Sequence, residues 1–178
     1  MTDNYVLPTG FRAAGFHCGI KDEAEKFDLA LFTSDVPSTA AGVFTQNRVC
    51  GAPVKISRKR LPRRTARAVI INSGNANACT GERGLNDAGW MTGKIAEHLY
   101  CAATDVLVCS TGMIGHFLPR EKLETGFAPI VEKLSASPEA FTDAARGMMT
   151  TDTFHKQSVR RCELNGKLVT VSGAAKGA

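Results

Sequence analysis

The residues with the clearest catalytic potential follow a short apolar run. Residues 105–109 are rich in apolar and β-branched side chains, which predicts a buried strand, and Ser110, Thr111 and Gly112 come directly after it. Glycine lets a backbone N–H approach a ligand closely, and a threonine hydroxyl can donate a second hydrogen bond. Two donors aimed at one developing negative charge are what acyl transfer requires. Thr111 and Gly112 are therefore candidates for an oxyanion site, and an ordinary turn after a strand is the alternative.

Two further stretches are rich in small polar residues. Residues 72–81 contain three asparagines and no charged side chain, and such residues tolerate left-handed backbone and supply amides for hydrogen bonds. This composition suggests a packed or substrate-facing loop, and a tight connector beneath a helix is the alternative. Residues 149–153 read Met-Thr-Thr-Asp-Thr at the end of an expected helix, where polar side chains can cap the helix, form a turn or bind a ligand.

The composition is that of a globular domain. With 178 residues, of which 43% are hydrophobic and 22% charged, the chain is expected to form one domain with a sizeable core. No apolar run approaches the roughly 18–20 residues needed to span a bilayer, and residues 1–5 lack the basic and apolar segments of a secretory signal. We therefore expect a cytoplasmic protein without a membrane partner.

The cysteines also favour a cytoplasmic protein. None of the six forms a C-x-x-C pair, which argues against a metal site such as zinc and against a disulfide framework, and favours reduced thiols. Cys109 lies beside the candidate oxyanion site, but its place in the apolar run predicts an inert buried thiol rather than a nucleophile.

Much of the net charge of +5 comes from the basic residues between positions 58 and 67. Such a cluster could bind nucleic acid, but no aromatic residue is interleaved with it to stack on bases. The other interpretation, which we favour, is a solvated connector between two strands with a turn at Pro62.

Hydrophobic periodicity predicts a mixture of strands and helices, and therefore an α/β fold. Strands are expected to begin at Phe16 and to cover residues 28–33, 41–46, 53–57, 66–71 and 105–109, followed by a hairpin of 158–164 and 167–172 around Asn165-Gly166. Helices are expected from Asn86 to about Tyr100, from Pro119 with a kink or break at Pro129, and after Ser137.

Taken together, several of these stretches resemble the α chain of the ornithine acetyltransferase family, also called glutamate N-acetyltransferase. Each motif is short, but their order and spacing match over nearly the whole chain. They are Asn-Ser-Gly-Asn-Ala-Asn-Ala-Cys-Thr-Gly at 72–81, Ser-Thr-Gly-Met-Ile-Gly at 110–115, Met-Thr-Thr-Asp-Thr at 149–153 and Ala-Lys-Gly at 175–177, with Gly-Val-Phe-Thr-Gln-Asn at 42–47.

The resemblance implies an α/β fold in which helix layers flank a mixed or antiparallel β-sheet, similar in layering to N-terminal-nucleophile enzymes. It implies that residues 1–178 are a single α-chain domain, completed by a separate β chain that arises from the same precursor by autocatalytic cleavage. In the family, the nucleophile is the threonine that begins the β chain. That threonine would lie beyond Ala178, so we expect no nucleophile in this chain and an α2β2 assembly.

The implied activity is transfer of acetyl from N2-acetyl-L-ornithine to L-glutamate in arginine biosynthesis, through an acetyl-threonine intermediate. Thr111 and Gly112 would form the oxyanion hole, and Thr150 and Lys176 would contact substrate, with Thr151 as the alternative if the alignment shifts by one. No cofactor is implied, although some family members use acetyl-CoA as a co-substrate. The rival hypotheses are a self-processing aminopeptidase or amidase of similar architecture and a basic nucleic-acid-binding module.

Overall fold

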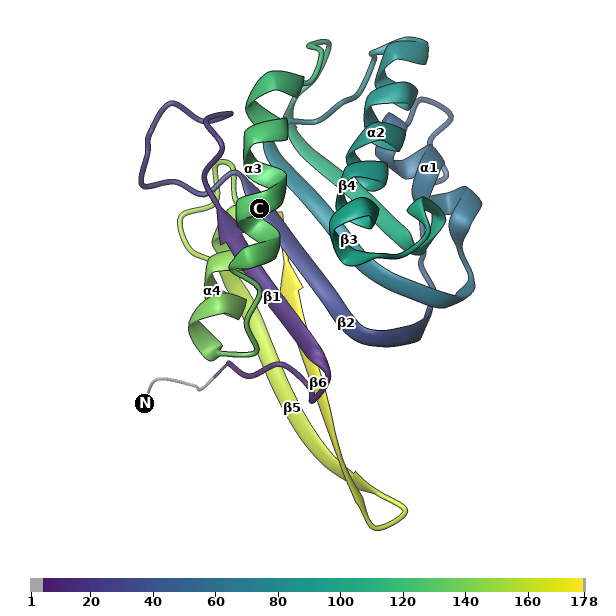
Figure 1. Cartoon of the computed structure of the whole chain (residues 1–178), viewed down its shortest axis with the longest axis vertical. Coiled ribbons are helices and arrows are strands. Elements are labelled where there is room, and N and C mark those ends of the chain that lie inside the picture. The colour runs from purple at the N-terminus through teal and green to yellow at the C-terminus, as the bar shows by residue number, and fades with distance from the viewer. Residues whose placement is uncertain (1–4, 178) are drawn as a thin grey trace.

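The computed structural model describes residues 5–177, which form a four-stranded sheet with helices on both faces and a separate two-stranded hairpin (Figure 1). The expectations that concern residues 1–4 and Ala178 lie outside this part of the chain. The strands are β1 (Phe11–Phe16), β2 (Leu29–Ala40), β3 (Arg63–Asn75), β4 (Val106–Met113), β5 (Lys156–Leu164) and β6 (Lys167–Ala175). The helices are α1 (Ala52–Arg60), α2 (Gly81–Leu99), α3 (Arg120–Glu132) and α4 (Pro138–Gly147), with a short 3-10 helix at Ala103–Asp105.

The sheet has mixed topology, as the sequence predicts. Its strand order is β1-β2-β3-β4, with β1–β2 and β2–β3 antiparallel and β3–β4 parallel. A parallel pair needs a crossover connection, which α2 supplies here. Because β3 and β4 run in the same direction, their carboxyl ends lie at the same edge of the sheet.

Alternate residues of the strands supply two apolar clusters, one on each face of the sheet. Leu31 and Ile70 belong to the larger cluster, with Met91 of α2 and Phe127 of α3. The smaller cluster lies under α4 and contains two strand residues, one helix residue and the residue that follows α4, which are Ala13, Ala30, Ala144 and Met148. Helices therefore flank both faces, which confirms the expected layering.

Glycines allow α4 to lie directly on β1 and β2. A Cβ atom on Gly15 would be 2.2 Å from the carbonyl oxygen of Asp143, and one on Gly147 would be 2.4 Å from that of Leu29. Real Cβ atoms do not approach backbone so closely, so these two positions exclude larger residues.

Helix α1 occupies residues that were predicted to be a strand, so the prediction for 53–57 is wrong. Pro53 is in the first turn of the helix, where its missing N–H costs nothing. The helix lies against the edge strand β4, whose backbone groups need partners. The Ser57 hydroxyl donates to the Val108 carbonyl at 2.8 Å and accepts from the Val108 N–H at 3.1 Å, while Arg60 donates to the Val106 carbonyl.

Other boundaries also differ from the predictions. Residues 41–46 are irregular and not a strand, and Val43 is almost fully exposed because β2 has no partner beyond Ala40. The first strand begins at Phe11 rather than at Phe16, and α2 begins at Gly81, so Asn86 lies within the helix and does not cap it.

A kink or a break was predicted at Pro129, but the proline does not break helix α3. The helix continues to Glu132, because the proline lies in the last turn, where only one backbone hydrogen bond is lost. The predicted cap of α4 is confirmed, since the Ser137 side chain accepts the Ala140 N–H at 3.2 Å. The predicted hairpin is also confirmed and extends beyond the sheet, with Asn165 and Gly166 at positive φ in its turn (Figure 1).

Among residues 5–177, no helix combines the length and the hydropathy that crossing a bilayer requires.

Replacement of Leu123 by alanine tests which apolar contacts stabilise the fold. Its side chain is fully buried between α3 and the sheet, whereas the Leu168 side chain on the hairpin is 72% exposed. Leu123→Ala should lower the free energy of unfolding by about 2–5 kcal/mol, because it removes buried methyl groups and leaves a cavity. Leu168→Ala should change it by about 0.5 kcal/mol or less. Urea denaturation followed by circular dichroism measures both, and equal effects would contradict this description of the core.

Candidate active site

Thr111 and Gly112 lie at the carboxyl end of β4, within the strand rather than in a turn after it. Thr111 pairs with Ser73 of β3, and Gly112 pairs with Gly74, after which the register shifts at Asn75. Thr111 and Gly112 are therefore strand residues and not part of a turn, and their role as an oxyanion site stays a prediction. The two strands end side by side, so each can contribute to one site.

Gly112 is required by the close approach of the two strand ends. Its φ is +134°, and a Cβ atom there would lie 2.3 Å from the carbonyl carbon of Gly74 and 2.5 Å from the N atom of Asn75. Thr111 is partly exposed, and Ser110 Oγ is buried without a hydrogen-bond partner among residues 5–177. The end of β4 thus presents polar groups on a backbone that cannot easily move.

The asparagine-rich loop is packed, and its amides hold other backbone segments in place. Asn72 Nδ2 donates to the Asn75 carbonyl at 2.8 Å, and Asn75 Nδ2 donates to the carbonyls of His116 and Phe117 at 3.2 and 3.0 Å. Asn77 Nδ2 donates to the carbonyl of Gly84 in α2 at 2.9 Å. The loop therefore fixes the segment that follows Gly112 and the start of α2, which supports the packed-loop interpretation and the connector interpretation alike.

A buried carboxylate also supports the segment after Gly112. Asp87 of α2 is 1% exposed and lies 3.9 Å from Arg83 and 3.7 Å from Arg120. Burial raises the pKa of Asp87, and the two arginines partly oppose that shift. The Arg83 guanidinium lies over the Phe117 ring, 4.0 Å from its centroid, and Arg120 lies over Trp90 at 4.3 Å.

Asp152 brings together the predicted substrate-contacting residues. Its carboxylate accepts the Thr150 N–H at 3.3 Å and the Lys156 Nζ at 2.8 Å, and the Lys176 Nζ lies 4.0 Å away. The hydrogen bond from Lys156 contributes most, and together these hydrogen bonds hold the pKa of the Asp152 carboxyl well below its usual range. Thr150 and Lys176, which are 26 positions apart, therefore share one anion. Sequence reasoning did not select Asp152, although it lies within the Met-Thr-Thr-Asp-Thr motif.

Thr150 and Thr151 line a cavity of about 570 Å³ between the β1–β2 connection and the segment after α4. Lys21 and Arg146 also line it. Thr151 is exposed, whereas Thr150 is partly buried. The Lys176 side chain is 32% exposed and is connected to this region through Asp152.

Ser73 connects the strand end that carries Thr111 and Gly112 to the segment that carries Thr150. It is fully buried, pairs with Thr111 in the sheet, and donates from Oγ to the carbonyl of Gly147 at 2.7 Å. Gly147 ends α4, three residues before Thr150. The structure therefore brings Thr111 and Gly112 into the neighbourhood of the Thr150 segment through one strand and one hydrogen bond.

The Cys109 thiol, which lies beside this site, was predicted to be buried, and this prediction is wrong. Cys109 is exposed, not buried, because it alternates with Val108 and so faces the same side of the sheet as α4, which packs on β1 and β2 and leaves this part of β4 uncovered. All six cysteines are free, and residues 5–177 contain no cluster of three or more histidine, cysteine or carboxylate side chains placed to hold a metal ion.

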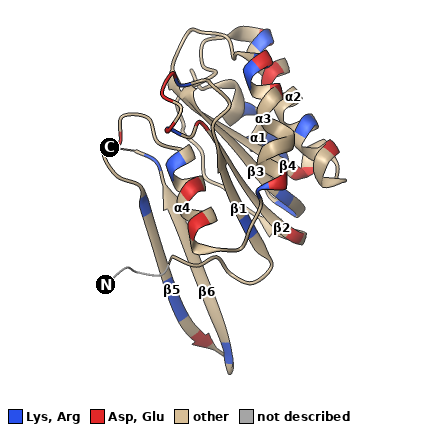
Figure 2. Cartoon of the chain, turned by 60° about the vertical axis from the view of Figure 1, so that its left-hand side comes forward, with Lys and Arg blue, Asp and Glu red and all other residues tan. Residues whose placement is uncertain are grey.

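The basic residues at 58–67 are not a simple connector between strands. They span the end of α1 and the start of β3, and besides Arg60 three of them bind other parts of the chain. Arg58 donates to the Thr45 carbonyl at 2.6 Å, Arg63 pairs with Asp105 at 2.6 Å, and Arg67 donates to the Ser34 carbonyl at 3.0 Å. Lysines and arginines also lie along β5 (Figure 2).

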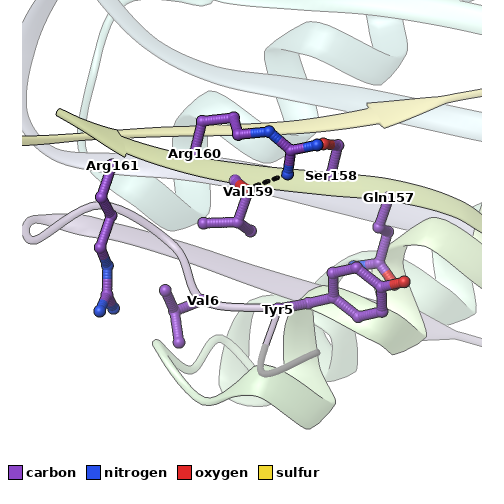
Figure 3. Close-up of a pocket in the computed structure, with 7 residues that line it drawn as sticks. All are labelled: Tyr5, Val6, Gln157, Ser158, Val159, Arg160 and Arg161. Atoms are coloured by element: carbon purple, nitrogen blue, oxygen red, sulfur yellow. Dashed lines mark hydrogen bonds between the residues drawn. The ribbon is translucent and has the colours of Figure 1, made fainter. Parts of the chain in front are cut away.

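A second cavity, of about 530 Å³, lies between the amino-terminal segment and β5 (Figure 3). Gln157 lines it, and both atoms of its side-chain amide are buried without a hydrogen-bond partner among the described residues. None of the predicted site residues lines this cavity, which separates it from the candidate site.

Comparison with solved structures shows the same fold in two proteins. The arginine biosynthesis bifunctional protein ArgJ of Bacillus halodurans superposes with a TM-score of 0.90 at 39% identity, covering 96% of this chain and 87% of that one. Ornithine acetyltransferase of Mycobacterium tuberculosis, in complex with ornithine, superposes with a TM-score of 0.90 at 40% identity, covering 99% of this chain and 93% of that one. The fold is therefore that of the ornithine acetyltransferase structures.

Residues 12–178 match the ArgJ family model, and the chain belongs to the ArgJ family. The arginine biosynthesis bifunctional protein ArgJ of Caldanaerobacter subterraneus is 49% identical over 171 residues, which are 96% of this chain and 41% of that protein. ArgJ of Bacillus subtilis is 40% identical over 178 residues, which are 99% of this chain and 42% of that protein. The chain thus spans about two fifths of the length of these relatives.

Gly112→Ala tests the close contact between the strand ends. The new Cβ would collide with the Gly74–Asn75 backbone, so we expect a loss of about 3 kcal/mol in the free energy of unfolding. Gly115→Ala is the matched control, because Gly115 also has a positive φ but no atom lies within 4 Å of the added carbon. Its expected cost is about 1–2 kcal/mol, from backbone strain alone. Equal losses in urea denaturation would show that the contact does not restrict position 112.

Proposed function

We propose that this chain is the α-chain part of an acetyltransferase that moves acetyl from N2-acetyl-L-ornithine to L-glutamate in arginine biosynthesis. The observation that carries the proposal is geometric. A hydroxyl and a backbone N–H lie at the end of a rigid strand, and Ser73 joins that strand end to the segment of Thr150. The family membership supports it, as does the likeness to a structure described as ornithine acetyltransferase with ornithine bound.

In this mechanism the nucleophile is a threonine hydroxyl from the β chain, with that residue's own α-amine as the base. The oxygen attacks the acetyl carbonyl, the C–N bond to ornithine breaks, and the departing amine takes the proton. Glutamate then attacks the acetyl-threonine through its amine, and the threonine oxygen recovers a proton as N-acetylglutamate leaves. One acetyl group is exchanged between two amines, so the reaction needs no cofactor, and acetyl-CoA would serve only as a second acetyl donor.

Thr111 and Gly112 act in this proposal on the acetyl oxygen, which becomes negative at both tetrahedral stages. The Thr111 hydroxyl and the Gly112 N–H donate to it. The donors gain most from being held in place before the charge forms, because no free energy is then spent on reorientation. The close contact of Gly112 with the Gly74–Asn75 backbone supplies that rigidity.

Thr150, Thr151 and Lys176 act on the substrates, which are amino acids with free carboxylates. The Lys176 ammonium suits a carboxylate because its pair with Asp152, at 4.0 Å, is too long to occupy its N–H donors. The hydroxyls of Thr150 and Thr151 can donate to or accept from the polar ends of the same molecules. The assembly in this proposal is cytoplasmic and contains two α and two β chains.

The experiment that tests the function follows labelled acetyl from N-acetylornithine in the matured protein. We expect label in N-acetylglutamate, and release of free acetate instead would support the amidase alternative. Thr111→Val should lower kcat about 10²–10³-fold with little change in the affinity for N-acetylornithine, because the charge that Thr111 meets exists only near the transition state. Thr170→Val is the control, since Thr170 is also a partly exposed strand residue. Cleavage is checked by gel first, and a matured Thr111→Val protein with unchanged kcat would exclude this role.

Lys176→Met tests the carboxylate contact. Loss of one hydrogen bond to a charged group costs about 1.5–3 kcal/mol, so KM for N-acetylornithine and for glutamate should rise about 10- to 100-fold. The rate of precursor cleavage should change less. Lys167→Met, at the exposed start of β6, removes the same charge far along the hairpin and should leave both KM values unchanged. Unchanged saturation in Lys176→Met would show that this lysine does not bind substrate.

A further inference from the structure

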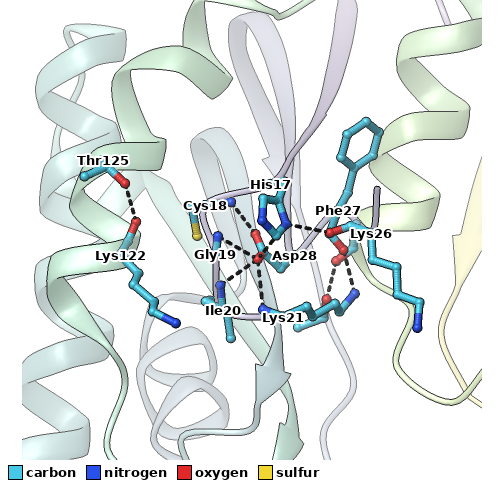
Figure 4. Close-up of polar contacts among 12 residues, drawn as sticks. His17, Cys18, Gly19, Ile20, Lys21, Lys26, Phe27, Asp28, Lys122 and Thr125 are labelled. Atoms are coloured by element: carbon cyan, nitrogen blue, oxygen red, sulfur yellow. Dashed lines mark hydrogen bonds and ion pairs between the residues drawn. The ribbon is translucent and has the colours of Figure 1, made fainter. Parts of the chain in front are cut away.

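Asp28, which precedes β2, is a fully buried carboxylate that holds the loop after β1 (Figure 4). It accepts hydrogen bonds from the backbone N–H groups of four consecutive residues at 2.7–3.1 Å, and these residues are Cys18, Gly19, Ile20 and Lys21. His17 Nδ1 lies 3.4 Å from the same carboxylate. Hydrogen bonds to a charged acceptor are strong and directional, so residues 18–21 have little freedom to move.

Lys21 extends from this loop to the segment that carries Thr150. Its Nζ donates to the carbonyl oxygen of Phe27 at 2.5 Å and to that of Met149 at 2.7 Å. The Met149 carbonyl belongs to the peptide bond that joins Met149 to Thr150. The lysine therefore holds the peptide group next to a residue that the proposed function assigns to substrate binding, and it lines the same cavity as Thr150.

The loop of residues 18–21 also contacts the β3 strand end that pairs with Gly112. A Cβ atom on Gly74 would lie 2.7 Å from Ile20 Cγ2, so the Ile20 side chain packs directly on the Gly74 backbone. Gly74 pairs with Gly112 in the sheet. Residues 18–21 thus contact both the strand end that presents Thr111 and the segment that presents Thr150.

The environment of Lys21 indicates that it has a specific task. Burial lowers its pKa, and the charges of Asp28, Glu23 and Asp152 oppose that shift only in part, since among residues 5–177 no carboxylate lies within 4.0 Å of the ammonium. Two of its three N–H donors are used on backbone carbonyls. A methionine of similar length would fill the same space without the cost of burying a charge, so the polar contacts are the reason to have lysine here.

We propose that Lys21 is a positioning residue, which is held by Asp28 and fixes the Met149–Thr150 peptide relative to the Thr111–Gly112 end of β4. It acts on substrate through Thr150 and not by contact. The assignment of Thr150 to substrate binding rests on the proposed function. The geometric part, that Lys21 orders residues 149–152, does not depend on it.

The kinetic test compares Lys21→Met with Lys26→Met in the matured protein. Lys26 lines the same cavity and carries the same charge, but among the described residues its ammonium pairs only with the exposed Glu23, at 2.7 Å. Lys21→Met should raise KM for N-acetylornithine roughly three- to tenfold with a smaller change in kcat, which is the size expected from one hydrogen bond. Lys26→Met should leave KM unchanged. Equal increases in both variants would mean that only the charge of the cavity matters, and the proposal would fail.

A double-mutant cycle with Thr150→Ala separates positioning from general structural support. If Lys21 acts through Thr150, Lys21→Met should have little further effect on KM once the Thr150 side chain is absent. Additive increases would overturn the proposal. Should Lys21→Met not fold, Lys21→Gln replaces it in the cycle, because it removes the ammonium but keeps a polar side chain.

Hydrogen exchange tests the geometry without any assay of activity. Peptides that cover residues 148–153 should exchange about three- to tenfold faster in Lys21→Met than in the wild-type protein or in Lys26→Met. Unchanged exchange would overturn the inference even if the protein transfers acetyl. Faster exchange in a protein that transfers no acetyl would instead leave the positioning role intact and remove the proposed function.

Discussion

The close contact of two backbone segments, at Gly74 and Gly112, is the constraint on which the candidate site depends. The parallel β3–β4 pair brings these residues together, and neither position has room for a Cβ atom. Gly112 lies against the Gly74–Asn75 backbone, and Gly74 lies against Ile20. The β3 and β4 backbones therefore meet without an intervening side chain, and the Ile20 side chain packs directly on Gly74. Thr111 gains a fixed position from this arrangement, because the end of β4 cannot move toward β3 without a collision.

Buried polar side chains supply the rest of the rigidity. At this edge of the sheet the strands have ended, so the backbone N–H and carbonyl groups must find partners outside the sheet. Asp28 binds four N–H groups, Asn75 binds the carbonyls of the segment after Gly112, and Ser73 binds the end of α4. Apolar packing fixes the layers of the fold, whereas these directional bonds fix the loops. An oxyanion site needs loops that are fixed by directional hydrogen bonds, since its donors must point in one direction before charge develops.

The reliable predictions came from features that act over a few residues. The β-branched runs of β3 and β4, the Asn165-Gly166 turn and the Ser137 cap each have a local physical cause, and the structure contains all of them. The failures came from residues whose state depends on a distant partner. Residues 53–57 alternate like a strand but form α1, because Ser57 satisfies the edge of β4 from 51 positions away. Residues 41–46 look equally strand-like but have no partner strand to pair with.

Motif order and residue chemistry are local properties, so the amino-acid sequence was enough to predict the α/β class, the family resemblance and the candidate residues Thr111, Gly112, Thr150, Thr151 and Lys176. Only the tertiary structure decided how these residues are grouped. Asp152 gathers Thr150 and Lys176, and Lys21 holds the carbonyl of Met149 across 128 positions of sequence. A lysine in a polar turn carries no local sign of such a contact. Its partner is set by where the sheet and α4 place the two backbones, which is a property of the packed chain.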